Sequence, residues 1–247
     1  MKSIPLATPD ISNRERRAVQ AVLRTRFLSR GPKLREFEKR FADYLSVQNA
    51  VATNSATSAL HLAMRCLNIK DGDHVITTPI SFIASANCIL FERAVPIFVD
   101  VEPVTHMLNP QKAEEKIKKL RAQGKPVKAI LAVDLFGYLA DWSRLRVMAK
   151  KYHLALIEDS AEALGSSMVL KGKPYMAGAF GDIGVFAFSA NKQIATGEGG
   201  MLVTNNRTFA DHARSMKSHG LPPAKPWGAF EELGYNYHMH EVTCALG

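Results

Sequence analysis

The chain has 247 residues, 47% of them hydrophobic and 22% charged, so it is long and apolar enough to fold around a full core. Lys and Arg exceed Asp and Glu by 32 − 23 = 9, which suits nucleic acid, an anionic membrane or a phosphorylated small substrate. The sequence carries no nucleic-acid-binding motif, no apolar run long enough to cross a bilayer and no signal-peptide pattern. We therefore expect a cytoplasmic protein with no nucleic-acid or membrane partner, and a phosphorylated substrate fits its basic charge equally well.

The N-terminal part of the chain predicts a helix that packs on the core. Apolar side chains recur at helical spacing between Leu34 and Leu45, and Gly31-Pro32 marks a turn before them. We expect residues 1–33 to form an N-terminal arm and helix, and residues 34–247 to form one large domain. The three cysteines have no metal-ligand spacing, so we predict no metal site and buried packing roles for Cys66, Cys88 and Cys244.

Short apolar runs alternate with helical stretches from about residue 50 to residue 205. This alternation requires crossover connections and predicts a mainly parallel sheet covered by helices on both faces. The candidate strands are Ala50–Ala52, Val75–Thr78, Pro96–Val101, Ala129–Asp134, Ala155–Glu158, Gly184–Phe188 and Met201–Thr204. The candidate helices are Ala56–Leu67, Ser81–Phe91, Pro110–Ala122 and Ser143–Tyr152.

The last part of the chain predicts a loop and the start of one more helix. Pro222–Pro226 is typical of an extended loop. Glu241–Gly247 has the pattern of the first two turns of a helix, and two turns alone are marginally stable. We expect this helix to belong to a longer structure of which the final portion is missing.

Several chemically active residues follow candidate strands, where ligands bind in open α/β sheets. Small and hydroxyl residues from Thr53 to Ser58 open a helix, and their N–H groups can hold a phosphate or simply cap the helix. Asp159 ends an apolar strand, where it can pair with a buried cation or cap the next helix. Phe82 can stack on a flat heterocycle, although core packing is the commoner role of a phenylalanine.

Lys192 is the most informative of these residues. It follows a buried apolar strand and precedes a glycine-rich turn, Gly197–Gly200. Burial disfavours the charged form of an amine and so frees the lone pair that attacks an aldehyde to give a Schiff base. A solvated loop lysine is the ordinary alternative for a residue of this type. A phosphate cradle, an aromatic, a carboxylate and this lysine thus occur in that order along the chain, and the ring nitrogen of pyridoxal phosphate would supply a buried cation for Asp159.

The chain resembles the DegT/DnrJ/EryC1/StrS family of sugar aminotransferases, which are fold-type I pyridoxal-phosphate enzymes. The resemblance rests on seven stretches in the family's order and spacing. They are Phe27–Pro32, Asn54–His61, Thr77–Phe82, Asp134–Gly137, Ile157–Gly165, Asn191-Lys192 with Thr196–Gly200, and Leu233–Tyr237. The resemblance implies a three-layer α/β/α large domain with a mostly parallel seven-stranded sheet, a homodimer, and pyridoxal 5'-phosphate as cofactor.

The same resemblance implies a role for each matching residue. Lys192 would form the Schiff base and act as the catalytic acid–base. The other cofactor-binding positions would hold the phosphate, stack on the ring, pair with its nitrogen or lie near its phenolic oxygen. They are Ala56 and Thr57 for the phosphate, Phe82 and Ala161 for the ring faces, Asp159 for the ring nitrogen and Glu162 for the phenolic oxygen. The family also contains dehydratases with His at the lysine position, and Lys192 argues against that branch.

Three positions depart from the family pattern. Ala187 stands where many relatives have a Ser that contacts the phosphate, a role that Ser189 or Asn191 could take over. His238 replaces an Arg or Asn that in some members reaches the partner subunit's phosphate, and His240 replaces a common Ser or Thr. The resemblance also implies that this chain contains only the large domain and lacks the family's C-terminal small domain.

The predicted function is a transaminase that moves an amino group from glutamate to a keto group of a nucleotide-linked deoxysugar in two half-reactions. Its partners would be the nucleotide sugar, the amino-acid donor and a second copy of the chain. The alternative is a truncated, non-catalytic homologue that acts as a dimerising or interaction module. The altered positions Ala187 and His238 motivate this alternative, and the retained Lys192, Asp159 and Thr57 argue against it.

Overall fold

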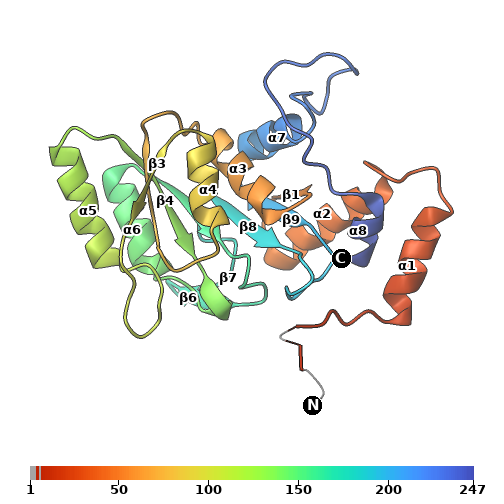
Figure 1. Ribbon diagram of the computed structural model, residues 1–247, viewed down its shortest axis with the longest axis horizontal. Helices are drawn as coiled ribbons and strands as arrows, with labels where there is room; N and C mark the ends of the chain where they lie inside the picture. The colour runs from red at the N-terminus through yellow and green to blue at the C-terminus, as the bar shows by residue number, and fades with distance from the viewer. Residues whose placement is uncertain (1–3, 6) are drawn as a thin grey trace.

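The computed structural model describes residues 4–5 and 7–247, which form three layers, helix, sheet and helix (Figure 1). The seven strands of the central sheet are β1 (Asn49–Thr53), β2 (His74–Thr77), β3 (Val95–Phe98), β4 (Val127–Val133), β5 (Ala155–Asp159), β8 (Ile183–Ala187) and β9 (Gly200–Thr204). A separate antiparallel pair consists of β6 (Ser167–Leu170) and β7 (Lys173–Met176). The helices are α1 (Asn13–Leu23), α2 (Pro32–Leu45), α3 (Ala56–Cys66), α4 (Ala84–Phe91), α5 (Pro110–Ala122), α6 (Trp142–Tyr152), α7 (Arg207–Met216) and α8 (Glu241–Leu246), with a 3₁₀ turn, η1, at Leu135–Gly137.

The sheet is mixed but mostly parallel. Its strand order is β1-β9-β8-β5-β4-β2-β3. Strand β9 pairs antiparallel with β1 and β8, whereas β8, β5, β4, β2 and β3 pair with one another in parallel. The seven candidate strands of the sequence are the seven strands of this sheet, so the predicted α/β fold class with its mostly parallel seven-stranded sheet is confirmed. Most of these strands are apolar on both faces because helices cover both sides.

Two groups of helices bury the two faces of the sheet. Helices α3, α4 and α7 pack on one face around residues such as Leu62, which is fully buried. Helices α5 and α6 cover part of the other face, where Trp142 is fully buried. Helix α2 covers the rest of that face and packs Phe37 and Phe41 against the ring of Phe188, with centroid distances of 5.2 and 5.5 Å. The stripe predicted from Leu34 to Leu45 is therefore a core-facing stripe.

Helix α8 lies between α1 and α2 at one end of the molecule (Figure 1). Residues on both sides of the expected domain boundary at 33/34 thus contact the C-terminal helix. Helix α1 packs against α8, and so does α2, whose Leu34 and Phe37 share a hydrophobic cluster with Cys244. Cys66, Cys88 and Cys244 are all buried, as expected for packing residues. Among the residues that the structure describes, no helix is both long and apolar enough to cross a membrane.

Three local features differ from the sequence-based expectations. Helix α4 begins at Ala84 rather than Ser81, because the preceding residues form a tighter turn in which Ser85 N–H donates to Phe82 C=O at 3.2 Å. Helix α7 was not predicted, although Asn206 caps it by accepting from the N–H groups of Thr208 and Phe209. The β6–β7 pair was also missed, since two four-residue strands carry little periodicity.

Candidate functional site

A cavity of about 340 Å³ opens where β4, β5 and β8 end and α3 begins. Its lining includes eight of the nine residues predicted from the sequence to bind a cofactor. These are Ala56, Thr57, Phe82, Asp159, Ala161, Glu162, Ser189 and Lys192. The ninth, His238, is not among the lining residues. The fold thus brings together residues that lie up to 136 positions apart, between Ala56 and Lys192.

The first turn of α3 forms one wall of the cavity. Ser55 caps the helix, and its hydroxyl accepts from Ser58 N–H at 3.1 Å. Among the described hydrogen bonds, none uses the N–H groups of Ala56 and Thr57. Two free amides at the positive end of a helix dipole are suited to a phosphate group. The start of α3 can pack closely against β9 because residue 200 is a glycine. A Cβ there would lie 2.4 Å from the Ser55 carbonyl carbon and 2.5 Å from Ala56 N.

Lys192 lies in a turn rather than at the end of a strand. Strand β8 ends at Ala187, and Lys192 N–H donates to Ser189 C=O at 2.9 Å in the turn that follows. The Lys192 side chain is 14% exposed, and its Nζ donates to Glu162 Oε1 at 2.9 Å. The other oxygen of Glu162 accepts from Phe136 N–H at 3.1 Å, which fixes the carboxylate. The amine is therefore held at the cavity wall by a single well-oriented partner.

Asp159 is buried at the end of β5 with one carboxylate face toward the cavity. Its Oδ2 accepts from Ser85 Oγ at 2.7 Å, and its Oδ1 accepts from Ala161 N–H at 3.3 Å. Burial raises the pKa of Asp159, and the hydrogen bonds from Ser85 and Ala161 and the charge of Lys192 oppose that rise. A bound cation would favour the ionised form further. Ser85 is a functional neighbour that the sequence did not reveal, because it lies 74 residues from Asp159.

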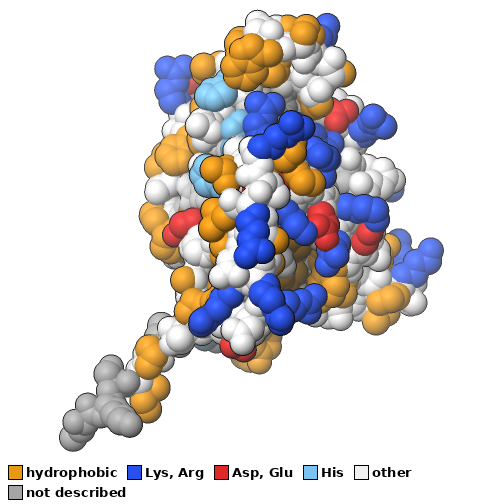
Figure 2. All heavy atoms as spheres, turned by 90° about the vertical axis from the view of Figure 1, so that its right-hand side faces the viewer, with side chains coloured by type: hydrophobic (Ala, Val, Ile, Leu, Met, Phe, Trp, Pro, Cys, Tyr) orange, Lys and Arg blue, Asp and Glu red, His pale blue; other side chains and the backbone are white. Residues whose placement is uncertain are grey.

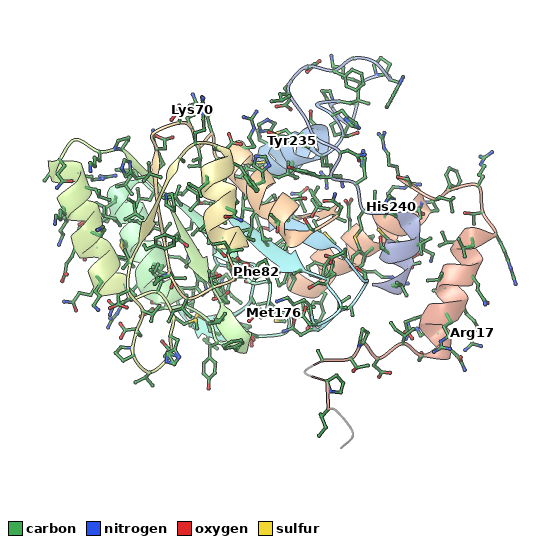
Figure 3. All side chains as sticks on the ribbon, in the orientation of Figure 1. Arg17, Lys70, Phe82, Met176, Tyr235 and His240 are labelled. Atoms are coloured by element: carbon green, nitrogen blue, oxygen red, sulfur yellow. The ribbon has the colours of Figure 1, made fainter. Side chains whose placement is uncertain are left out.

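Phe82 borders the cavity and is 74% exposed, which rules out the core-packing role. Figure 3 labels it just before the N-terminal end of α4. Ala161 lies in the same lining, immediately after β5. Its methyl group leaves room for a flat ring, and an exposed aromatic next to a cavity can stack on one.

Ser189 and Asn191 also line the cavity, near the position of Ala187. The Ser189 hydroxyl donates to Asn191 Oδ1 at 2.9 Å. Because Ala187 has no polar atom on its side chain, hydrogen-bonding capacity at this wall comes from the turn that follows β8. Ser189 and Asn191 thus both line the cavity in which either could take over the phosphate contact that the sequence predicts to be lost at Ala187.

His238 lies in a basic cluster outside the cavity. Figure 3 shows His240, two residues further on, at the start of α8 and well separated from Phe82. The Nδ1 atom of His238 is buried and has no partner among the described residues. Burial and the nearby positive charges of Arg30 and Lys217 lower the pKa of His238 to about 4, so its ring is neutral at physiological pH.

Basic side chains gather on the face of the molecule that carries α1 and α8 (Figure 2). The segment from Ser12 to Arg30 holds a large part of this charge, with Glu15 as its only acidic residue. Its arginines are Arg14, Arg16, Arg17, Arg24, Arg26 and Arg30. A positive surface of this kind attracts polyanions over a distance of about 8–10 Å at ordinary salt.

The family model described as "DegT/DnrJ/EryC1/StrS aminotransferase family" matches residues 9–247. The chain belongs to this family. It is 39% identical to the GDP-perosamine synthase of Escherichia coli O157:H7 over 100% of the chain and 65% of that relative. Helicobacter pylori PseC, an aminotransferase involved in the biosynthesis of pseudoaminic acid, superposes with a TM-score of 0.89 at 30% identity, over 99% of this chain and 64% of PseC.

A third similar structure is the PLP-form of Spr1654 from Streptococcus pneumoniae, with a TM-score of 0.89 at 28% identity. It covers 100% of this chain and 65% of Spr1654. The chain thus spans a little under two thirds of the length of the relatives it matches. These comparisons confirm the fold predicted from the resemblance and indicate a pyridoxal-phosphate-dependent aminotransferase family.

Proposed function

We propose that this chain is the cofactor-binding part of a transaminase that moves an amino group from glutamate to a keto group of a nucleotide-linked deoxysugar. The observation that carries the proposal is the position of Lys192. Its amine lies in a cavity that also holds two free helix amides, at Ala56 and Thr57, and the buried carboxylate of Asp159. The relationship to GDP-perosamine synthase supports a nucleotide-linked sugar as the substrate class.

The residues of the cavity fit pyridoxal 5'-phosphate. The free N–H groups of Ala56 and Thr57, with the Thr57 hydroxyl and Ser189, would hold the phosphate. Phe82 and Ala161 would face the two sides of the ring. The two backbone N–H groups are held in place by the first turn of α3 before any ligand arrives, which lowers the entropic cost of binding.

When bound, this cofactor supplies an aldehyde carbon and a ring that withdraws electrons. Lys192 Nζ would bind that carbon and then move a proton between the donor Cα and the C4′ atom. Asp159 would keep a proton on the ring nitrogen through a charge-assisted hydrogen bond. Glu162 would hold the Lys192 amine within the cavity in the meantime, since it already accepts its hydrogen bond at 2.9 Å.

The charges of the cavity lining suggest that cations from another chain complete the site. Among the described residues that line it, Lys192 is the only Lys or Arg, whereas Asp134, Asp159, Glu162 and Glu198 are acidic. Glutamate and a nucleotide diphosphate are both anionic and require cations. We propose that a second copy of the chain supplies some of them, with the exposed Arg30, which lies near His238, as a candidate. The homodimer and the cytoplasmic location stay predictions.

An absorbance titration tests this function. Added pyridoxal phosphate should give a protein-bound band in the wild type that Lys192→Ala removes and that glutamate converts to the pyridoxamine spectrum. Lys112→Ala, an exposed lysine on α5, is the matched control and should behave like the wild type. A folded wild-type chain without the band would favour the alternative, a non-catalytic interaction module. A band that persists in Lys192→Ala would mean that another amine of the chain reacts with pyridoxal phosphate.

A further inference from the structure

Two buried carboxyl groups, Asp134 in the cavity wall and Glu158 next to it, share one hydroxyl. Ser160 Oγ lies 2.8 Å from Asp134 Oδ2 and 3.0 Å from Glu158 Oε1. A serine hydroxyl carries a single proton, so it can donate to only one of these oxygens at a time. If both carboxyl groups were ionised, one of the two contacts would join two lone pairs in a buried place. One of the acids must therefore carry a proton that it donates to Ser160.

The remaining hydrogen bonds identify which acid carries it. Glu158 is fully buried, and both of its oxygens accept from backbone amides. Oε1 accepts from Gly178 N–H, and Oε2 accepts from Phe180 N–H at 2.8 Å and from Gly181 N–H at 3.2 Å. Glu158 thus accepts from three backbone amides, whereas Asp134 accepts from two N–H groups, so the negative charge is better stabilised on Glu158. Glu158 is thus the anion of the pair.

Asp134 has a different arrangement. Its Oδ1 accepts from Ala140 N–H at 2.8 Å and from Trp142 Nε1 at 3.0 Å. Among the described hydrogen bonds, the only partner of its Oδ2 is the hydroxyl of Ser160. We infer that Asp134 is protonated at Oδ2 at neutral pH and donates to Ser160 Oγ, which in turn donates to Glu158 Oε1.

The electrostatic surroundings of Asp134 agree with this assignment. Burial and the charge of Glu158 raise the pKa of Asp134 well above its usual value, against the hydrogen bonds from Ala140, Ser160 and Trp142. Glu158 faces Asp134 from β5. On the cavity side the charged lining residues are Asp159, Glu162, Glu198 and the single cation Lys192. The acids outnumber the cation, so the charges around Asp134 favour its neutral form.

The proton has a consequence for the site. Asp134, Glu158 and Asp159 stand at the ends of two adjacent strands, β4 and β5, and three negative charges there would push one another toward protonation. With Asp134 neutral, the Asp134–Glu158 pair carries one charge instead of two. Asp159 can then ionise more readily beside a bound cation. This consequence rests on the proposed function, whereas the protonation of Asp134 does not. Asp134 is accordingly a positioning residue.

Infrared spectroscopy of the chain without cofactor tests the inference directly. A protonated carboxyl group absorbs in a carbonyl region that is separate from the carboxylate bands. We expect such a band at neutral pH in the wild type and its loss in Asp134→Asn, whose amide can take the same hydrogen bonds. Asp159→Asn is the matched control, since Asp159 is also buried, and it should keep the Asp134 band.

Isotope labelling makes the test independent of how the variants fold. Carbon-13 at the aspartate side-chain carboxyl should shift the band of the wild type, and carbon-13 at the glutamate carboxyl should leave it in place. A band that shifts with labelled glutamate would assign the proton to Glu158 and overturn the inference. Absence of a protonated-acid band, or a band lost only in Asp159→Asn, would overturn it as well. None of these readouts depends on transaminase activity, so they can fail or succeed separately from the proposed function.

Discussion

The carboxylate of Glu241 lies directly against the backbone of Gly31, at the start of α2. Its Oε1 accepts from Gly31 N–H at 2.9 Å and from Leu34 N–H at 2.8 Å, and its Oε2 accepts from Lys33 N–H at 2.8 Å. Glu241 is 1% exposed, and its contacts with the amides of Gly31 and Leu34 are buried. One side chain of α8 thus satisfies three of the unpaired N–H groups with which any helix begins.

This contact predicts a large loss of stability in Glu241→Ala. Three amides, two of them buried, would lose their acceptor, and we expect the free energy of unfolding to fall by about 3 kcal/mol. Glu115→Ala, an exposed glutamate on α5, is the control and should change it by less than about 0.5 kcal/mol. Urea unfolding measures both. Equal losses in the two variants would contradict the role given to Glu241.

The close approach at Gly200 predicts a specific effect on ligand binding. In Gly200→Ala the new Cβ meets the backbone of Ser55 and Ala56, so the first turn of α3 must move. We expect the affinity for pyridoxal phosphate to fall at least about tenfold, equal to about 1.4 kcal/mol. Gly197→Ala is the control, because it has φ of +86° but open space at its Cβ. It should lower stability by about 1 kcal/mol and leave phosphate affinity nearly unchanged.

The neutral ring of His238 predicts a loss of stability in acid. Its pKa is lowered to about 4 in the folded protein, against an ordinary value of 6.5, so the unfolded chain binds more protons between these pH values. Stability is therefore complete above pH 6.5 and declines as the pH falls toward 4. The charged groups nearby are Arg30, Lys217, His219 and His240.

We expect this decline to be smaller by roughly 1–2 kcal/mol in His238→Asn than in the wild type. His153→Asn, an exposed histidine with φ of +49°, is the control and should match the wild type. Unfolding curves at several pH values measure the difference. A wild type and a His238→Asn variant with parallel pH profiles would contradict the prediction.

The net charge of +9 predicts salt-sensitive binding of nucleotide diphosphates. Raising the salt from 0.1 M to 1 M shortens the Debye length from about 10 Å to about 3 Å, which weakens the attraction of the basic face. We expect the affinity for a nucleoside diphosphate to fall, and the affinity for the uncharged nucleoside to change little. Calorimetry at two salt concentrations makes the comparison. Equal salt dependence for the two ligands would argue against a role for the charge.

The parts of the fold that the sequence predicted are those with strong local patterns. All seven strands of the sheet were recognised because buried parallel strands are apolar runs, and Pro110 and Asn109 mark the start of α5 in the sequence itself. The β6–β7 pair was missed because it is short and partly exposed, and α7 was missed although Asn206 gave a capping signal.

The candidate site shows the same division. Lys192 and Thr57 follow strands and Asp159 ends one, so all three could be found from their positions in the sequence. The contacts that orient them could not, because Ser85 lies 74 residues from Asp159 and Phe136 lies 26 residues from Glu162. The clamp between Glu241 and Gly31 joins residues 210 positions apart, and neither end carries a local sign of the other. Sequence patterns thus identify the reactive side chains, whereas tertiary contacts decide their orientation and their hydrogen-bond partners.

The single antiparallel strand of the central sheet, β9, also determines which local unfolding event would disrupt the cavity. It joins Gly200, beside the start of α3, to β1 through a register that pairs Thr53 with Gly200 and Asn49 with Thr204. This pairing spans about 150 residues, so it closes one of the longest loops in the chain. A fluctuation that opened β1 from β9 would separate the helix amides from the Lys192 turn while the parallel strands stayed paired. Hydrogen exchange at β1 should therefore report the earliest loss of the cavity, before the rest of the sheet unfolds.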